Sequence, residues 1–503
     1  MKHILHAKVK KLGIRDGEEL IVVLNEIDAL NYGLNAFDKV EILKGKDTLV
    51  VNLDTTKELV RVGEVGIFDD VLDKISLENN SLVNIKFTKR SNTSVNAIRK
   101  KMQGKAIDEK EINSIIKDIS QNKMIDSLMT YYVASSFFYP TSNKEMYLTA
   151  KAMAENGIMF KYPKFEIVAD KHCIGGVPGN ETTMILIPLI ASLGIKIPKN
   201  FSKAITSPAA TGECVSVLMD ISFDKKGIEK LIKKNNCCLV RGGSLDLAPA
   251  DDTLIQIQYP LSMQNIAKVV SSIMAKKYAM GITHSLIDIP MGPTAKVKNM
   301  KEAKEWKKKF EIVGKGLGMK MSVQITDAKQ PIGAGIGAVL QVREVLRVLQ
   351  QHEKRPDDLE KKAVFLASKI IENVGMAKGK EAEKLAYGQL VSGEAWKYMQ
   401  KIIKAQNGKN PDQKSEELKL AKNKKEILVE KSGTVKNIDM KFLNDVCRTL
   451  GAPLDLKAGI YLDNKVGDKV KKGDVLCTFY SDDELKINLA LKMMKKRSFY
   501  EIK

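Results

Sequence analysis

The sequence is poor in the residues that build extracellular scaffolds and metal sites, because its 503 residues hold only six cysteines and five histidines. No cysteines are spaced as C-x-x-C, and the adjacent Cys237 and Cys238 cannot complete a four-ligand zinc site alone. Scattered thiols of this kind are typical of a reducing compartment. The G-x-S-x-G and H-E-x-x-H motifs are also missing. The sequence therefore argues against a disulfide scaffold, a zinc enzyme and a serine hydrolase.

Long apolar runs are missing as well. The longest mostly apolar stretch, Met184–Ile195, has 12 residues and contains Pro188, whereas a membrane span needs about 20 residues. The first residues, Met1–Lys8, lack the apolar stretch of a secretory signal. We therefore expect a soluble cytoplasmic protein without a membrane partner.

Charge of one sign is in excess, with 82 Lys and Arg against 61 Asp and Glu, a formal net charge of +21. Such a surplus favours anionic partners, which include nucleic acid, lipid and phosphorylated metabolites. The lysines are spread along the chain without a patch that interleaves aromatic residues. Nucleic acid is therefore the least favoured partner.

Residues 1–87 contain short runs of Val, Ile and Leu, separated by Asp, Asn and Gly. In the last run, Val83, Ile85 and Phe87 alternate with polar residues, which is the period of a half-buried strand. The runs that predict strands are Leu20–Leu24, Val40–Leu43, Leu49–Leu53 and Leu82–Phe87. They predict a small N-terminal β-barrel.

Helical signals dominate residues 88–160. Asp108 with Glu111, and Ser142 with Glu145, have the spacing of capping boxes, and isoleucines at helical spacing follow the first pair. A helical domain is predicted here, joined by parts of 248–285.

The rest of the chain predicts a multi-domain α/β protein. Between residues 161 and 405, short apolar runs alternate with helical segments, which is typical of an α/β domain with a central, largely parallel sheet. The lysine-rich stretch 406–425 predicts a linker, and residues 426–503 predict a C-terminal α+β domain.

The segment from Phe165 to Thr183 predicts a strand, a glycine-rich loop and a helix. The glycines let the backbone approach a ligand closely, and the helix start presents unpaired N–H groups to an anion. Lys171 and His172 stand at the strand end, where open α/β sheets bind ligands, and this favours an anion site over an ordinary tight turn. The pKa range of histidine also suits proton transfer to a leaving group. The residues concerned are Lys171, His172, Gly175, Gly176, Gly179, Thr182 and Thr183.

Four other segments give weaker signals. A loop about 30 residues later carries hydroxyls that suit a phosphate or a sugar, and equally a plain turn: Ser202, Thr206, Ser207 and Thr211, with Lys203 among them. The acidic cluster in Gly242–Asp252 favours helix capping over metal binding. Ser272 and Lys276 share one helix face, on which a solvated lysine is the simpler interpretation. Gly333–Gly337 has the wrong spacing for a dinucleotide loop.

Together these segments resemble the thymidine phosphorylase family and, within it, the AMP phosphorylase branch. The matching motifs occur in order over nearly the whole chain: Asp170–Gly179, Ala204–Thr211, Leu247–Asp252, Ser271–Lys277, Asp288–Lys296, Gln330–Gly333, Gly459–Leu462 and Gly467–Asp474. The N-terminal barrel points to the nucleotide-acting branch, since nucleoside-acting relatives usually begin with the helical domain.

The resemblance implies a pentosyltransferase that splits nucleoside 5′-monophosphates (AMP, with CMP and UMP as further candidates) with phosphate. The products would be free base and ribose 1,5-bisphosphate. It implies no metal or organic cofactor, since phosphate is a co-substrate, and a homodimer or larger homo-oligomer. The alternatives are a pyrimidine-nucleoside phosphorylase, which needs no 5′-phosphate pocket, and a nucleotide-binding paralogue with impaired catalysis.

The resemblance also assigns roles to individual residues. Lys171, Thr182 and Thr211 would hold the attacking phosphate, and Lys276 would face the base. The positions that would bind the nucleotide are Gly176, Ser202, Lys203, Ala204, Ile205, Thr206, Ser207, Thr211, Ser272, Lys276 and Lys296.

The chain departs from the family pattern at several of these places. Gln264 stands where the family has an acidic proton donor, and an amide cannot donate a proton as an acid. His172, or a water ordered by Gln264, is the candidate replacement. Lys203 and Tyr259 stand where arginine is common, Glu181 where relatives are often basic, and Cys173 where serine is common.

Overall fold

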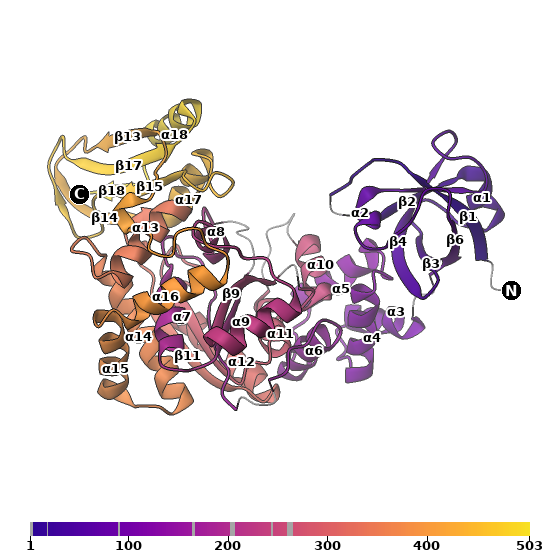
Figure 1. Ribbon diagram of the computed structural model, residues 1–503, viewed down its shortest axis with the longest axis horizontal. Coiled ribbons are helices and arrows are strands. Elements are labelled where there is room, and N and C mark those ends of the chain that lie inside the picture. The colour runs from indigo at the N-terminus through magenta and orange to yellow at the C-terminus, as the bar shows by residue number, and fades with distance from the viewer. Residues whose placement is uncertain are drawn as a thin grey trace. The chain divides into compact units, whose positions relative to one another are not determined.

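The computed structural model describes residues 4–17, 19–88, 91–162, 166–201, 207–242, 245–258 and 265–503. The chain divides into two compact units, one formed by Met1–Gly157 with Ala248–Ala275 and the other by Ile158–Leu247 with Lys276–Lys503. Figure 1 labels many of the elements of both units. Within the described ranges, no helix combines the length and the apolar character that a membrane crossing requires.

The first unit begins with a closed barrel in the strand order β1-β5-β2-β4-β3-β6 (Figure 1). Its strands are β1 (Ile4–Lys11), β2 (Ile21–Asn25), β3 (Lys39–Lys44), β4 (Asp47–Thr56), β5 (Glu64–Ile67) and β6 (Leu82–Phe87), with the short helices α1 (Glu26–Asn31) and α2 (Asp69–Leu72). Along β1, Leu5, Ala7 and Val9 are buried while His6 and Lys8 are exposed, as expected for a strand with one face on a core. The predicted barrel is confirmed, and β1 and β5 are strands that the sequence pattern did not predict.

Helices make up the remainder of this unit. They are α3 (Asn92–Met102), α4 (Glu109–Ser120), α5 (Asp126–Phe138), α6 (Asn143–Glu155), α10 (Pro249–Gln258) and α11 (Ile266–Ala279), of which α11 belongs to this unit up to Ala275. Both predicted capping boxes are confirmed. The Asp108 side chain accepts the Glu111 N–H at 2.8 Å, and the Ser142 hydroxyl accepts the Glu145 N–H at 3.1 Å.

The second unit contains parallel strands in the order β11-β10-β7 and a parallel pair β8-β9. A parallel bridge between Val168 and Lys196 links the two groups just before β7 and β8. The strands are β7 (Ala169–Cys173), β8 (Ile197–Phe201), β9 (Cys237–Arg241), β10 (His284–Met291) and β11 (Lys320–Asp327). The predicted α/β domain with parallel strands is confirmed.

Several helices of this α/β region pack against α7 (Thr182–Ser192), which contains most of the longest apolar stretch of the sequence. Every residue of α7 from Thr182 to Ala191 is buried, as expected for a helix that is apolar on all sides. The other helices are α8 (Thr211–Ser216), α9 (Lys225–Asn235), α12 (Met300–Gly316), α13 (Ala338–Leu349), α14 (Asp357–Val374), α15 (Gly379–Val391) and α16 (Glu394–Ala405). Burial of α7 fixes the position of its first residue, Thr182.

The C-terminal part of this unit is built on antiparallel strands. Its elements are β13 (Asn423–Leu428), β14 (Gly433–Ile438), β15 (Gly459–Leu462), β16 (Lys469–Val470), β17 (Val475–Ser481), β18 (Tyr500–Ile502), α17 (Met440–Thr449) and α18 (Glu484–Lys496), with a short 3-10 helix at Ser415–Glu417. Strand β12 (Gly335–Ile336) of the α/β region pairs with β15 and so joins the two parts. The glycines of Gly333–Gly337 serve packing, since a Cβ on Gly337 would lie 2.4 Å from the Ala458 carbonyl oxygen. In the predicted linker, Gln406 is buried, and its side chain bonds the backbone of Leu239.

Candidate active site

The glycine-rich loop joins the end of β7 to the first residue of α7, as the sequence predicted. Gly176 and Gly179 have φ values of 93° and 74°, which residues with a side chain rarely adopt. A Cβ on Gly176 would lie 2.9 Å from the backbone nitrogen of Lys296, and one on Gly179 would lie 2.1 Å from the Ile332 carbonyl oxygen. The two glycines therefore allow both the backbone conformation and the close packing of this loop.

Lys171 lies in strand β7, four residues before Gly175, the first glycine of the loop, and its side chain is completely buried. Its ammonium group donates to the Thr182 hydroxyl at 2.8 Å and to the Thr183 hydroxyl at 3.3 Å, at the start of α7. No carboxylate of the described residues forms an ion pair with it. Burial lowers the pKa of Lys171, because a desolvated ammonium is costly. An anion placed here would meet this cation, two hydroxyls and the positive end of a helix.

A buried network of charges lies directly beside Lys171. The Asp170 carboxylate is fully buried and lies 3.0 Å from the ammonium group of Lys277. Lys199 donates to the Lys171 carbonyl oxygen at 2.8 Å and lies 3.5 Å from Asp170, and burial lowers the pKa of Lys199 to about 8. Sequence reasoning missed Lys199 and Lys277. The available signal was a lysine at the centre of the strand Ile197–Phe201, where lysines are rarely buried without a partner.

Glu181 connects this loop to the second predicted loop. It immediately precedes α7, is 2% exposed, and accepts a hydrogen bond from the Thr211 hydroxyl at 3.1 Å. Burial raises the pKa of Glu181 to about 7, although the charge of Lys171 and the hydrogen bond from Thr211 oppose the rise. The carboxyl group next to the glycine-rich loop is therefore about half ionised at neutral pH.

His172 and Cys173 end strand β7 on the loop side. Burial and the charges of Lys277, Lys199 and Lys171 hold the pKa of His172 well below its usual value, so its imidazole is neutral at pH 7. Burial raises the pKa of Cys173 to about 11, which keeps it a neutral thiol. Its sulfur accepts the Gly175 N–H at 3.4 Å. A neutral imidazole can form hydrogen bonds here, whereas the imidazolium that would act as an acid is scarce.

The other predicted residues are distributed as follows. In the first unit, the Ser272 hydroxyl donates to the Asp251 carboxylate at 2.7 Å, which places that acidic residue at the start of α10 beside α11. Lys276 is partly buried in the second unit. Lys296 is exposed, and its backbone nitrogen lies next to Gly176. Within the described part of the chain, no group of acidic, cysteine or histidine residues could hold a metal ion.

Several predicted residues lie outside the described ranges. They are Ser202, Lys203, Ala204, Ile205, Thr206 and Gln264. Ser207 is described, partly buried, four residues before Thr211 at the start of α8.

Comparison with known proteins supports a family assignment. Residues 434–501 match the pyrimidine nucleoside phosphorylase C-terminal domain, and residues 166–396 match the a/b domain of a glycosyl transferase family. The AMP phosphorylase of Methanococcus maripaludis strain C5 is 35% identical over 98% of this chain and 97% of its own length. The chain belongs to the AMP phosphorylase family. The AMP phosphorylase of Thermococcus kodakarensis is 38% identical, with coverage of 98% and 97%.

A solved structure shares the fold of part of the chain. Anthranilate phosphoribosyltransferase from Thermus thermophilus superposes with a TM-score of 0.53 at 15% identity, over 62% of this chain and 99% of its own. At this identity the likeness concerns the fold alone. The AMP phosphorylase relatives, in contrast, span the chain from the barrel to the C-terminal strands.

Proposed function

We propose that this protein catalyses the phosphorolysis of AMP to adenine and ribose 1,5-bisphosphate, with CMP and UMP as further substrates. The observation that carries the proposal is the buried ammonium group of Lys171 at the start of α7, which bonds hydroxyls and pairs with no carboxylate among the described residues. Membership of the AMP phosphorylase family supports the choice of substrate.

The reaction exchanges one bond at C1′ of the ribose for another. As the C1′–N bond lengthens, C1′ gains oxocarbenium character and a phosphate oxygen attacks it. The electron pair of the broken bond stays on the base nitrogen. Hydrogen phosphate loses its proton when it becomes a phosphate ester, and the leaving base takes up one proton, so the proton balance closes without an external acid. Holding two anions together against their repulsion is then the main task of the protein.

The binding roles follow from this scheme. Lys171, Thr182 and Thr211 hold the attacking phosphate, with the helix dipole of α7 adding to the field. Lys296, with Gly176, contacts the nucleotide, as do residues 202–207. Ser272 also binds the nucleotide, and Lys276 faces the base. The C-terminal α+β domain packs on the α/β domain through β12.

Proton delivery to the base uses groups that form hydrogen bonds. Gln264 orders a water or contacts the base directly, and neutral His172 acts as a hydrogen-bond partner rather than as a charged acid. The protein works as a homodimer or a larger homo-oligomer and uses neither a metal nor an organic cofactor.

The proposal is tested by chromatography of free base after incubation with AMP, CMP, UMP or the matching nucleosides, with and without phosphate. Adenine release from AMP that strictly requires phosphate is the expected result. Base release from nucleosides alone would instead indicate a nucleoside phosphorylase. No release from any substrate, with nucleotide binding intact in the same sample, would indicate the non-catalytic paralogue.

Replacing Gln264 with aspartate is expected to raise kcat for AMP phosphorolysis by about tenfold, because positioned acids usually contribute that much or more. Gln264→Asn is the matched control, since it shortens the side chain without adding an acid. Steady-state kinetics at fixed phosphate measures both variants. An aspartate variant no faster than the asparagine variant would contradict a role for position 264 in proton delivery.

A further inference from the structure

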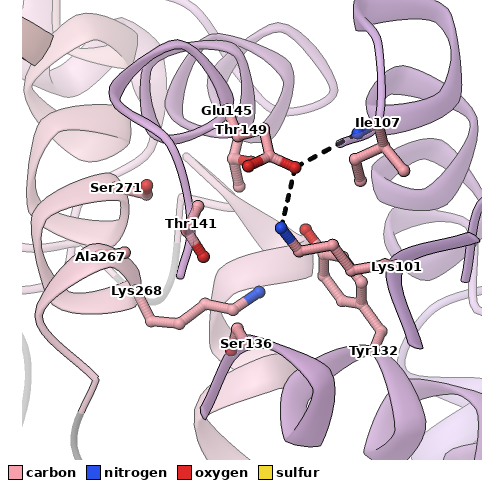
Figure 2. A pocket seen from close by; sticks show the side chains of 10 residues that line it. All are labelled: Lys101, Ile107, Tyr132, Ser136, Thr141, Glu145, Thr149, Ala267, Lys268 and Ser271. Carbon is pink, nitrogen blue, oxygen red and sulfur yellow. Dashed lines mark hydrogen bonds and ion pairs between the residues drawn. The ribbon is translucent and has the colours of Figure 1, made fainter. Parts of the chain in front are cut away.

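A small pocket lies inside the helical part of the first unit, between α3, α5, α6 and α11 (Figure 2). The centre of a water-sized molecule can occupy about 20 Å³ of it, and all empty space, with the open solvent at its mouth included, amounts to about 320 Å³. Two lysines, a glutamate, a tyrosine and several hydroxyls line it. None of these residues belongs to the set that the proposed function uses.

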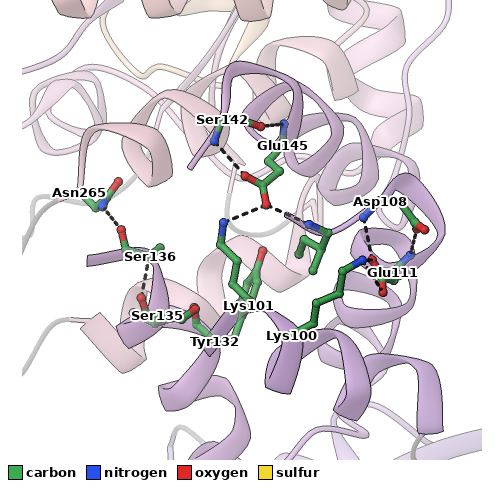
Figure 3. A network of polar contacts seen from close by, with 12 residues as sticks. Lys100, Lys101, Asp108, Glu111, Tyr132, Ser135, Ser136, Ser142, Glu145 and Asn265 are labelled. Atoms are coloured by element: carbon green, nitrogen blue, oxygen red, sulfur yellow. Dashed lines mark hydrogen bonds and ion pairs between the residues drawn. The ribbon is translucent and has the colours of Figure 1, made fainter. Parts of the chain in front are cut away.

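The one carboxylate of this pocket is already fully occupied, as Figure 3 shows. One oxygen of Glu145 accepts the Lys101 ammonium group at 2.8 Å and the Ile107 N–H at 3.3 Å, and the other accepts the Ser142 N–H at 2.9 Å. Burial acts against ionisation, but these hydrogen bonds prevail and hold the pKa of Glu145 below its usual value. The negative charge of Glu145 is therefore matched by the positive charge of Lys101.

Lys268 is a second cation in the pocket, and its charge is not matched. Its ammonium nitrogen lies 3.8 Å from the centre of the Tyr132 ring. No carboxylate of the described residues forms an ion pair with it. A cation–π contact compensates part of the lost hydration of an ammonium group and leaves the charge in place. The pocket therefore carries a net charge of about +1 from these side chains.

Hydroxyl groups in the pocket offer both donors and acceptors. The Thr141 hydroxyl oxygen is buried and has no hydrogen-bond partner among the described residues, which is costly unless a ligand or water bonds it. The hydroxyls of Ser136 and Ser271 donate to the carbonyl oxygens of Val133 and Met146, at 2.6 and 3.0 Å. Their remaining lone pairs can accept a hydrogen bond from a ligand.

We propose that this pocket binds hydrogen phosphate, at a site separate from the one around Lys171. An oxyanion suits the unmatched charge of Lys268 and the free donor of Thr141. The P–O–H group of hydrogen phosphate also suits the serine lone pairs, which sulfate and chloride cannot satisfy. The proposal does not depend on phosphorolysis, because the two sites share no residue.

Equilibrium dialysis with radiolabelled phosphate counts the sites in the full-length chain. We expect Lys171→Met and Lys268→Gln each to bind one phosphate fewer per chain than the native protein, and the double variant to bind two fewer. Lys110→Gln, at an exposed position of α4, is the matched control and should bind as the native protein does. Circular dichroism of each variant checks that the chain is folded.

The possible outcomes separate this proposal from the proposed function. If Lys268→Gln binds as many phosphates per chain as the native protein, the second site is overturned. If Lys268→Gln binds fewer phosphates than the native protein but Lys171→Met binds as many, the second site is supported. The phosphate site around Lys171 is then contradicted. Radiolabelled phosphate that remains bound to Lys171→Met should be displaced by unlabelled phosphate at a concentration at least tenfold lower than that of sulfate or chloride needed for the same displacement. Equal displacement by chloride would overturn the assignment to hydrogen phosphate.

Discussion

Lys171→Met is expected to lower kcat/KM for AMP phosphorolysis by about 10³-fold, since removing one preorganised donor from a charged site commonly costs 10²- to 10³-fold. The ammonium group is buried, lies at the start of α7, and bonds only hydroxyls among the described residues. Methionine has nearly the same length and fills the same space without the charge. Steady-state kinetics with varied phosphate measures the effect, which should fall mainly on the phosphate dependence.

The same variant should leave the phosphate-free protein at least as stable as the native one. Burial lowers the pKa of Lys171, which shows that its charge is costly in the folded state. Thermal unfolding is the measurement, and added phosphate should raise the Tm of the native protein more than that of the variant. Lys380→Met, at an exposed position of α15, is the control. A clear fall in the Tm of Lys171→Met, with activity retained, would identify Lys171 as structural instead.

Glu181→Gln is expected to remove a pH dependence of both stability and phosphate binding. Burial raises the pKa of Glu181 from 4.5 to about 7. A carboxyl with a raised folded pKa stabilises the fold below pH 4.5, and that stability is lost as the pH rises towards 7. A shift of this size corresponds to about 3 kcal/mol in the free energy of unfolding. At pH 8 the glutamine variant should therefore be more stable than the native protein by about that amount.

Phosphate binding should change in the same direction. The ionised Glu181 repels an anion at the start of α7, with Lys171 and Lys199 opposing the repulsion. The variant should have a KM for phosphate about tenfold lower at pH 8 and nearly equal to the native value at pH 5.5, where Glu181 is protonated. Comparing the two proteins at one pH cancels the ionisation of phosphate itself. If the ratio of the two KM values stays constant between pH 5.5 and pH 8, the ionisation of Glu181 does not control phosphate binding.

Local features of the fold could be predicted because neighbouring residues decide them. The capping pair Asp108 and Glu111 is three residues apart and forms as expected. The strand, glycine loop and helix around Lys171 are continuous in the chain, so the contact of Lys171 with Thr182 follows from one supersecondary unit.

Other features depended on contacts that short-range patterns do not contain. Strand β1 closes the barrel by pairing with β6, nearly 80 residues away. Its alternation of Leu5, Ala7 and Val9 with polar residues is as long as the one that predicted β6, so it was an available signal that was missed. The weak glycine signal at Gly333–Gly337 had a packing cause, since β12 pairs with β15 from the C-terminal part.

The sequence by itself determined the family and the strand, glycine-rich loop and helix around Lys171. A motif can be found in a sequence because its functional residues stand close together in the chain, as Lys171, Gly176 and Thr182 do. Only the tertiary structure decided which charges compensate one another. Strand β8 brings Lys199 to Asp170, and α8 brings Thr211 to Glu181. Whether a buried charge is matched depends on neighbours that folding supplies, so Lys171 and Lys268 could be recognised as unmatched only in the folded chain.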